Sequence, residues 1–159
     1  LYAGTRQEIF LDQLAPEEIP EWRSESLDLH EARAQPDLGM YVPQFIFRDF
    51  TFESAYWELG QNRNWLSVGW RATDGSYSEA RVMIYGNGTY AGSEEPLPRD
   101  GLTEEALAQR LTYVDGDSGD SPGYRGRIAV AYDVGETVVE YAFKGLTLEE
   151  ALNFILGQS

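Results

Sequence analysis

The sequence predicts an α+β fold, with an antiparallel β-sheet of about five or more strands and helices packed on one face. Segments with an apolar side chain at every second position indicate half-buried strands, and they recur along the chain. Segments with an apolar stripe at helical spacing follow residues that cap helices. The dipeptides Asp74-Gly75 and Asn87-Gly88, which favour tight turns, follow strand-like segments.

The last third of the chain shows both patterns in succession. Residues 127–133 and 137–144 alternate apolar side chains with others, and Gly135 between them indicates a tight turn. We expect this hairpin to be the central pair of the sheet. Further on, Thr147 and Glu150 form a capping box, and the helix that they begin has an apolar stripe. The stripe consists of Leu148, Ala151, Leu152, Ile155 and Leu156.

Four more strands are expected in the aromatic-rich middle of the chain. The first covers residues 44–49, after a proline, and the others cover residues 52–59, 65–71 and 77–85. A Gly-Leu-Thr opening with glutamates in the first turn, like that of the last helix, predicts a further helix after Thr103.

The first part of the chain is expected to lie outside this domain. Residues 1–26 are predicted to form an N-terminal helix and a linker, and residues 27–159 a single α+β domain. The helix is predicted at residues 5–14, from a capping box and an apolar face. A short helix is also expected within residues 26–35, which contain His30, the single histidine of the chain. A lone histidine is more often structural or exposed than catalytic.

The charge of the chain is strongly negative, with 27 acidic against 12 basic side chains and a formal net charge of −15. Such a surface repels phosphate backbones, so nucleic acid is not expected as a partner. The chain has no cysteine, which excludes disulfides and thiolate chemistry within it. No apolar run is long enough to span a membrane, so we expect no membrane insertion by this segment. A membrane anchor upstream of Leu1 is expected instead.

No catalytic residue, metal site or cofactor is predicted. The chain lacks the Gly-x-Ser-x-Gly and phosphate-loop motifs, and one histidine is too few for a zinc site. The acidic loop at residues 115–121 contains spaced aspartates, but it departs from a calcium-binding EF-hand loop at three positions. We expect Asp115, Asp117 and Asp120 to be exposed and mobile, without bound metal.

The candidate ligand- or partner-binding residues are Trp57 and Trp65. Residues 41–70 contain more large aromatic rings than one sheet face needs. The remaining rings would form an exposed patch, and such patches often mark surfaces that bind partners or ligands. Both tryptophans are expected on the face opposite an apolar run. The alternative is that a helix covers them.

The order of elements adds a resemblance to a known family. A short helix, Tyr-Val-Pro at residues 41–43, aromatic strands and a loop precede a closing hairpin and the Thr147-x-x-Glu150 helix. Over residues 27–156 this order resembles an uncharacterised bacterial domain family found in lipoproteins and anti-sigma-factor-like membrane regulators, and residues 136–150 match best. The resemblance implies an extracytoplasmic domain that is tethered to a membrane and has no known enzymatic residues.

Two functions of different class follow from these observations. The first is a non-enzymatic extracytoplasmic sensor or binding domain of a membrane-tethered bacterial protein, of which an anti-sigma-factor-like regulator is one form. Its partner would be a protein or a cell-envelope ligand. The alternative is a carbohydrate-active enzyme or sugar-binding module that uses carboxylates and aromatic rings. A third reading is an acidic protein that blocks a basic partner.

Overall fold

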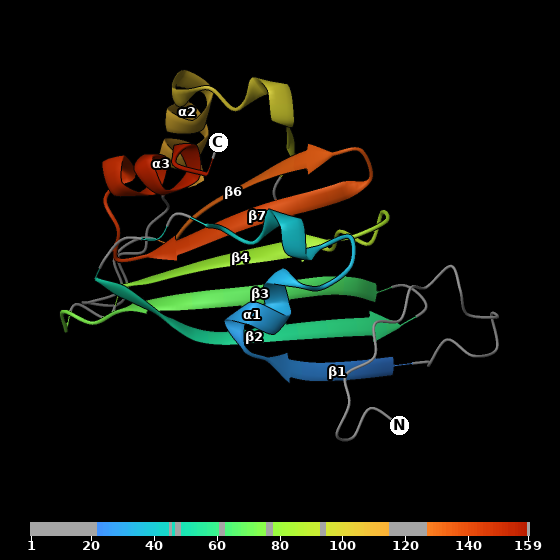
Figure 1. Cartoon of the computed structure of the whole chain (residues 1–159). Coiled ribbons are helices and arrows are strands. Elements are labelled where there is room, and N and C mark those ends of the chain that lie inside the picture. Colours follow the sequence, from blue (N-terminus) through green and yellow to red (C-terminus); the bar gives the residue numbers. More distant parts are fainter. Residues whose placement is uncertain are drawn as a thin grey trace.

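The computed structural model describes most of the chain from residue 22 onwards (Figure 1). The described residues are 22–44, 46, 49–60, 63–75, 78–92, 95–114 and 127–158, with the backbone alone for 22, 23, 111–114, 127 and 128. They form a seven-stranded, mostly antiparallel sheet and three α-helices, which confirms the α+β class. The predicted helix at residues 5–14 and the acidic loop at residues 115–121 lie outside the described residues.

The strands lie side by side in the order β1-β2-β3-β4-β7-β6-β5. Their bounds are β1 Trp22–Leu27, β2 Phe50–Gly60, β3 Arg63–Ala72, β4 Glu79–Tyr85, β5 Leu97–Pro98, β6 Arg127–Val134 and β7 Thr137–Lys144. The helices are α1 Leu29–Arg33, α2 Glu104–Val114 and α3 Leu148–Leu156, and short 3-10 turns cover Gly39–Tyr41 and Arg99–Gly101. Each neighbouring pair of strands is antiparallel except β5 and β6, which are parallel.

The predicted hairpin of β6 and β7 is confirmed, but its expected place at the centre of the sheet is wrong. Gly135 turns the chain with a φ of 63°, which glycine adopts without a steric penalty. The middle strand is β4, with β3 on one side and β7 on the other. Three strands lie beyond β4 on the β3 side, whereas the hairpin has only the two-residue β5 beyond it. The hairpin is therefore displaced towards one edge of the sheet.

The strands predicted at residues 52–59, 65–71 and 77–85 correspond to β2, β3 and β4, and the strand predicted at residues 44–49 is wrong. Of that segment, Gln44, Ile46 and Asp49 are described, and none lies in a strand. The amide of Gln44 donates to the side chain of Gln158 at 2.9 Å and not to a neighbouring strand. The carbonyl of Asp49 accepts from the amide of Thr73 at 2.8 Å, which continues the pairing of β2 with β3 one residue beyond Phe50 and Ala72. Asp49 therefore leads into β2 and does not belong to a separate strand.

Part of the segment expected to be a linker, within residues 1–26, is a strand. This strand is β1, which begins at Trp22 and pairs along its length with β2. The short helix expected within residues 26–35 is α1, which begins at Leu29 because Asp28 caps it. The Asp28 carboxylate accepts from the amide of Glu31 at 2.8 Å, and the Glu31 carboxylate accepts from the amide of Asp28 at 2.9 Å. Residues 22–26 therefore belong to the sheet. The boundary of the domain upstream of them stays a prediction.

The core is built on a row of side chains that crosses the sheet on one face. Register pairs join Ala55, Val68, Val82, Tyr141 and Val130 in succession, from β2 to β6. All five side chains are buried. Since strand residues alternate between faces, this row defines the core face of the sheet, and the residues between them define the opposite face.

Each helix contributes a buried side chain to the same hydrophobic cluster. These are Ala32 of α1, Leu107 of α2 and Phe154 of α3. The capping box of Thr147 and Glu150 begins α3 as predicted. The predicted apolar stripe of α3 omitted Phe154, yet its ring contacts Trp70, Tyr141 and Phe143 edge-on, with centroids 6.4, 6.1 and 5.4 Å away.

Candidate functional site

The sheet face opposite the core row carries mainly polar and small side chains, and we call it the polar face. Two neighbouring rows cross its centre, in register from β2 to β7. One row is Tyr56, Ser67, Met83 and Glu140, and the next is Ser54, Gly69, Arg81 and Ala142. Because side chains of a strand point alternately to the two faces, the pairing of β2, β3, β4 and β7 brings residues that are far apart in the chain together on the polar face.

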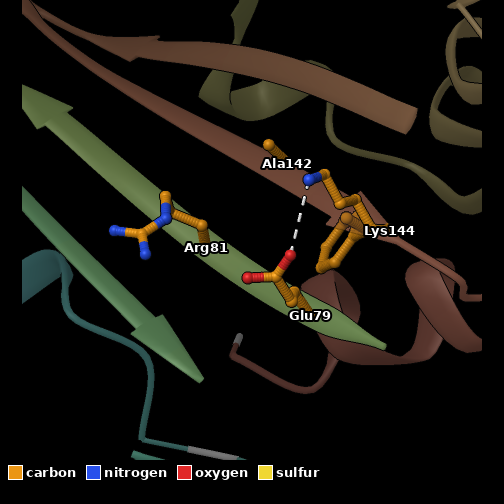
Figure 2. A pocket seen from close by; sticks show the side chains of 5 residues that line it. Glu79, Arg81, Ala142 and Lys144 are labelled. Atoms are coloured by element: carbon orange, nitrogen blue, oxygen red, sulfur yellow. Dashed lines mark ion pairs between the residues drawn. The ribbon is translucent and has the colours of Figure 1, made fainter. Parts of the chain in front are cut away.

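A small hollow lies on the polar face between β4 and β7, and Figure 2 shows its lining. Its volume is about 150 Å³, and it is lined by Glu79, Arg81, Ala142, Phe143 and Lys144. Glu79 and Lys144 are register partners, as are Arg81 and Ala142. The Lys144 ammonium lies 3.5 Å from a Glu79 carboxylate oxygen. Because Ala142 has a short side chain, the charged side chains around it leave space.

A chain of ion pairs runs across the sheet beside this hollow. Arg71 on β3 contacts Glu53 on β2 at 2.5 Å and Glu79 on β4 at 3.3 Å, and Glu79 contacts Lys144 on β7. The hydrogen bond to Glu53 and its negative charge raise the pKa of Arg71. The chain of charges therefore connects four strands on one face.

Arg81 lies flat across β3, towards β2. Its Nη1 donates to the Ser67 hydroxyl at 2.8 Å, and its Nη2 donates to the Ser54 hydroxyl at 3.5 Å. Nη2 is 3.9 Å from a carboxylate oxygen of Glu53. This path is open because the residue opposite Arg81 is Gly69, on which a β-carbon would lie 2.5 Å from Nη2. Glycine inside a strand often marks such a close approach.

An aromatic group lies on the polar face at the other end of β4. Trp65 and Tyr85 stack with centroids 6.1 Å apart, and the ring of Tyr90 meets Tyr85 edge-on at 5.0 Å. The Tyr90 hydroxyl and a Glu140 carboxylate oxygen are 3.2 Å apart, and Glu140 is only 7% exposed. Burial, together with the charge of Glu140, raises the pKa of Tyr85 to about 12.

The structure separates the two tryptophans that the sequence singled out. Trp65 lies on the polar face and is half-buried against Tyr85. Trp57 pairs in register with Leu66 and lies on the core face, where its indole N–H donates to Asn64 at 3.2 Å. The expectation that Trp57 faces away from an apolar run is therefore wrong. A binding role for either ring stays a prediction.

The residues that line the hollow, and Tyr56, were not predicted as site residues from the sequence. Tyr56 is 48% exposed on the polar face, beside Ser67. A signal for the hollow was present, since Gly69 and Arg81 are equidistant from Gly75, the glycine of the predicted turn. A hairpin centred on Gly75 pairs those two residues, and the unusual glycine inside β3 then marks the place.

His30 is exposed on α1, away from this site. Within the described ranges, no three His, Cys, Asp or Glu side chains are grouped so that they could hold a metal ion. None of the helices in the described part of the chain is long and apolar enough to cross a membrane. A scan against models of protein families, a search of curated proteins and a search of solved structures each gave no match.

Proposed function

We propose that this chain is a non-enzymatic binding domain on the outer side of a bacterial membrane, and that it binds a peptide segment of a partner protein on the polar face. All three helices pack on the core face in this proposal. The shared cluster of Ala32, Leu107 and Phe154 with the core row supports that arrangement. The extracytoplasmic location, the tether and a role like that of an anti-sigma-factor-like regulator rest on the resemblance of residues 27–156.

The observation that carries the proposal is the hollow on the polar face between Glu79 and Lys144, beside a chain of ion pairs that connects four strands. Exposed ion pairs such as those of Arg71 add little to the stability of a fold, because water and salt screen them. Four strands thus hold a defined arrangement of charges that adds little to stability. Positioned polar groups around a hollow are typical of a binding surface, where they determine orientation and specificity.

The size of the hollow favours one group of a large partner over a whole small molecule. Pockets that enclose small ligands usually measure about 300–1,000 Å³. The hollow on the polar face measures about 150 Å³, so it holds a side-chain-sized group. A peptide lying on the sheet would place one side chain in the hollow and others over the neighbouring residues, among them the exposed Tyr56.

A sugar-binding module is the second candidate, and Tyr56 is the observation that favours it. Its half-exposed ring lies on the same face as Trp65, and sugars stack on exposed aromatic rings. The other rings of this face are stacked on one another, however, since Tyr85 lies between Trp65 and Tyr90. Their faces are therefore partly occupied within the protein, and the charged hollow is the better-formed feature.

The proposal is tested with phage-displayed random heptapeptides as the probe. The matched variants are Tyr56→Glu on the polar face and Met40→Glu in the turn at Gly39–Tyr41. Both replace an exposed large side chain, 48% and 71% exposed, and both add one negative charge. Peptides enriched on the wild-type protein are expected to lose binding to Tyr56→Glu and to keep binding to Met40→Glu.

Two outcomes would contradict the proposed function. One is that repeated selection enriches no peptide above an unrelated control protein. The other is that Met40→Glu abolishes binding while Tyr56→Glu does not, which would locate the binding surface away from the polar face. Because both substituted side chains are well exposed, neither variant is expected to unfold the domain, and circular dichroism checks this directly.

A further inference from the structure

We infer that the place of Tyr90 on the polar face is a binding site for a tyrosine side chain of the partner peptide, and that Tyr90 fills it as an internal ligand. This inference rests on the proposed function and names the chemistry of one contact on the same face. Tyr90 belongs to the loop after β4, whereas Tyr85 and Glu140, which its side chain contacts, belong to strands. A loop residue can leave a site that the strands keep in place.

The site has an aromatic wall and a polar end. The wall is the ring of Tyr85, which stacks with Trp65 at 6.1 Å and meets the ring of Tyr90 edge-on at 5.0 Å. The hydroxyl of Tyr85 donates to the sulfur of Met83 at 3.7 Å, which helps to orient this wall. The polar end is the carboxylate of Glu140, 3.2 Å from the Tyr90 hydroxyl. A ring with an acceptor beyond it matches the apolar body and polar tip of a tyrosine.

Glycine at position 92 makes room for the phenol of Tyr90. A β-carbon there would lie 2.5 Å from Cε1 and 2.6 Å from Cζ of the Tyr90 ring. The backbone of the loop therefore passes beside the hydroxyl end of the ring and helps to close the site over it. Because Tyr90 and Gly92 belong to the same loop, a movement of the loop opens the site and leaves its strand residues in place.

The carboxylate of Glu140 would make the site selective for tyrosine over phenylalanine. Glu140 is 7% exposed, although it lies on the polar face. A buried carboxylate depends on its hydrogen-bond donors, and the Tyr90 hydroxyl is one of them. A ligand that displaces Tyr90 therefore has to supply a donor in its place. The tyrosine side chain reproduces both the ring contact and the hydroxyl, whereas phenylalanine reproduces the ring contact alone.

The hydrogen bond that Tyr90 makes is longer than such bonds usually are. A hydroxyl donor typically lies about 2.5–2.7 Å from a carboxylate oxygen. The Tyr90 hydroxyl lies 3.2 Å from Glu140, and its backbone follows Thr89, whose hydroxyl bonds to the carbonyl of Gly86 at 2.6 Å. A tyrosine on a separate peptide is not restrained by this loop and can approach the carboxylate more closely. It could thus compete with the internal group.

The test is an NMR titration of the intact chain with acetyl-Gly-Lys-Thr-Tyr-Thr-Lys-Gly-amide and with the same peptide carrying phenylalanine. The lysines favour association with a chain of net charge −15. A site filled by Tyr90 about nine-tenths of the time loses about tenfold in affinity for a competitor. Tyr90→Ala is therefore expected to bind the tyrosine peptide about tenfold more tightly than wild type does. The phenylalanine peptide should gain about threefold at most, because it brings no donor to Glu140.

Tyr56→Ala is the matched control, because it removes a tyrosine from the same face that is 48% exposed. It should bring no gain in affinity. p-Cresol and toluene probe the site without a peptide. In Tyr90→Ala, p-cresol should shift the amide signals of Tyr85 and Glu140 and bind at least about threefold more tightly than toluene. In wild type these shifts should be absent, because Tyr90 fills the site.

The outcomes separate this inference from the proposed function. Unchanged or weaker binding of the tyrosine peptide by Tyr90→Ala would overturn the inference, and peptides that are enriched on the wild-type protein and lost in Tyr56→Glu would still support the polar face as the binding surface. An equal gain in Tyr56→Ala would show that the effect is not specific to the site, which also overturns it. If p-cresol binds to Tyr90→Ala while neither peptide gains affinity, the site takes a small phenol and a partner peptide is the wrong ligand.

Discussion

The guanidinium of Arg81 occupies the space that a β-carbon on residue 69 would need. Such a carbon would lie 2.5 Å from Nη2 and 2.8 Å from Cζ of Arg81, which is the register partner of Gly69. The absence of a side chain on β3 therefore decides the position of a charged group on β4. The relationship links a choice of residue inside a strand to the geometry of the proposed binding site.

Replacement of Gly69 by alanine is expected to separate binding from stability. The new β-carbon would meet only the end of a flexible side chain, so Arg81 shifts and the strand gains a better residue than glycine. We expect the free energy of unfolding in urea to change by less than about 1 kcal/mol. Affinity for peptides enriched on the wild-type protein should fall about threefold or more, because the displaced Arg81 changes the polar face. Unchanged affinity would show that its position does not matter.

Gly39→Ala is the matched substitution at a second close approach. There the β-carbon would lie 2.3 Å from the carbonyl oxygen of Arg33, which is backbone and cannot move aside cheaply. Urea unfolding should show a loss of about 2 kcal/mol or more, within the range of strongly destabilising single substitutions. A neutral effect would mean that the turn at Gly39–Tyr41 adapts easily.

Tyr141→Asp is expected to unfold the domain. Tyr141 belongs to the core row and is 2% exposed, and its ring contacts Tyr132, Phe143 and Phe154. An unpartnered carboxylate there costs several kcal/mol, roughly the stability of a small domain. Circular dichroism should show lost structure at room temperature. The control Tyr141→Phe keeps the ring and should remain folded; a folded Tyr141→Asp protein would contradict the position of the core.

Alkaline pH should reveal the burial of Tyr85. Its pKa is raised from 10.0 to about 12, so the folded state holds the phenolic proton more tightly than the unfolded state. This contribution to stability is complete below pH 10 and is lost as the pH rises towards about 12. In Tyr85→Phe, the free energy of unfolding should therefore fall less steeply over this interval.

Tyr132 and Tyr141 also have raised pKa values, and both are present in the wild type and in Tyr85→Phe. Burial raises the pKa of Tyr132 and Tyr141, so each also lowers stability at high pH. Their contributions cancel when wild type and Tyr85→Phe are compared in urea titrations at matched pH. Identical pH dependence in the two proteins would show that Tyr85 is not buried against its neighbours as described.

The alternation of apolar residues predicts which side chains of the main strands face the core. It does not predict the order of the strands in the sheet. From this alternation, Val68, Val82 and Tyr141 are each predicted to lie on the buried face of their strand, and in the structure they are register partners. Whether β4 or β7 stands at the centre depends on pairing between segments about sixty residues apart. Such pairing is determined by the whole set of strands, so no local pattern indicates it.

Strand β1 could not be predicted from its sequence. Its residues, Trp-Arg-Ser-Glu-Ser-Leu, do not alternate clearly between apolar and polar. As an edge strand it pairs with β2 alone, through backbone hydrogen bonds that any of these residues can make. Asp28, which ends the strand and caps α1, was the usable signal, because its carboxylate and Glu31 match a capping box.

The hollow was partly accessible from sequence. Gly69 and Arg81 could have been paired through the turn at Gly75, since a hairpin is a local structure. Glu79 and Lys144 could not have been paired in that way, because they meet only when β7 lies beside β4. The hollow lies between β4 and β7 and depends on the second pairing, so it emerges only from the folded sheet.

The most direct test of the binding site is a map of the backbone amide shifts of the isotope-labelled chain when a peptide enriched on the wild-type protein is added. If the peptide binds in the hollow, the largest changes at saturation occur on β3, β4 and β7, at Gly69, Arg81, Ala142 and Lys144. Residues of α1 and of the turn at Gly39–Tyr41 should change little. The largest changes in the helices, with the amides around the hollow unaffected, would contradict binding on the polar face.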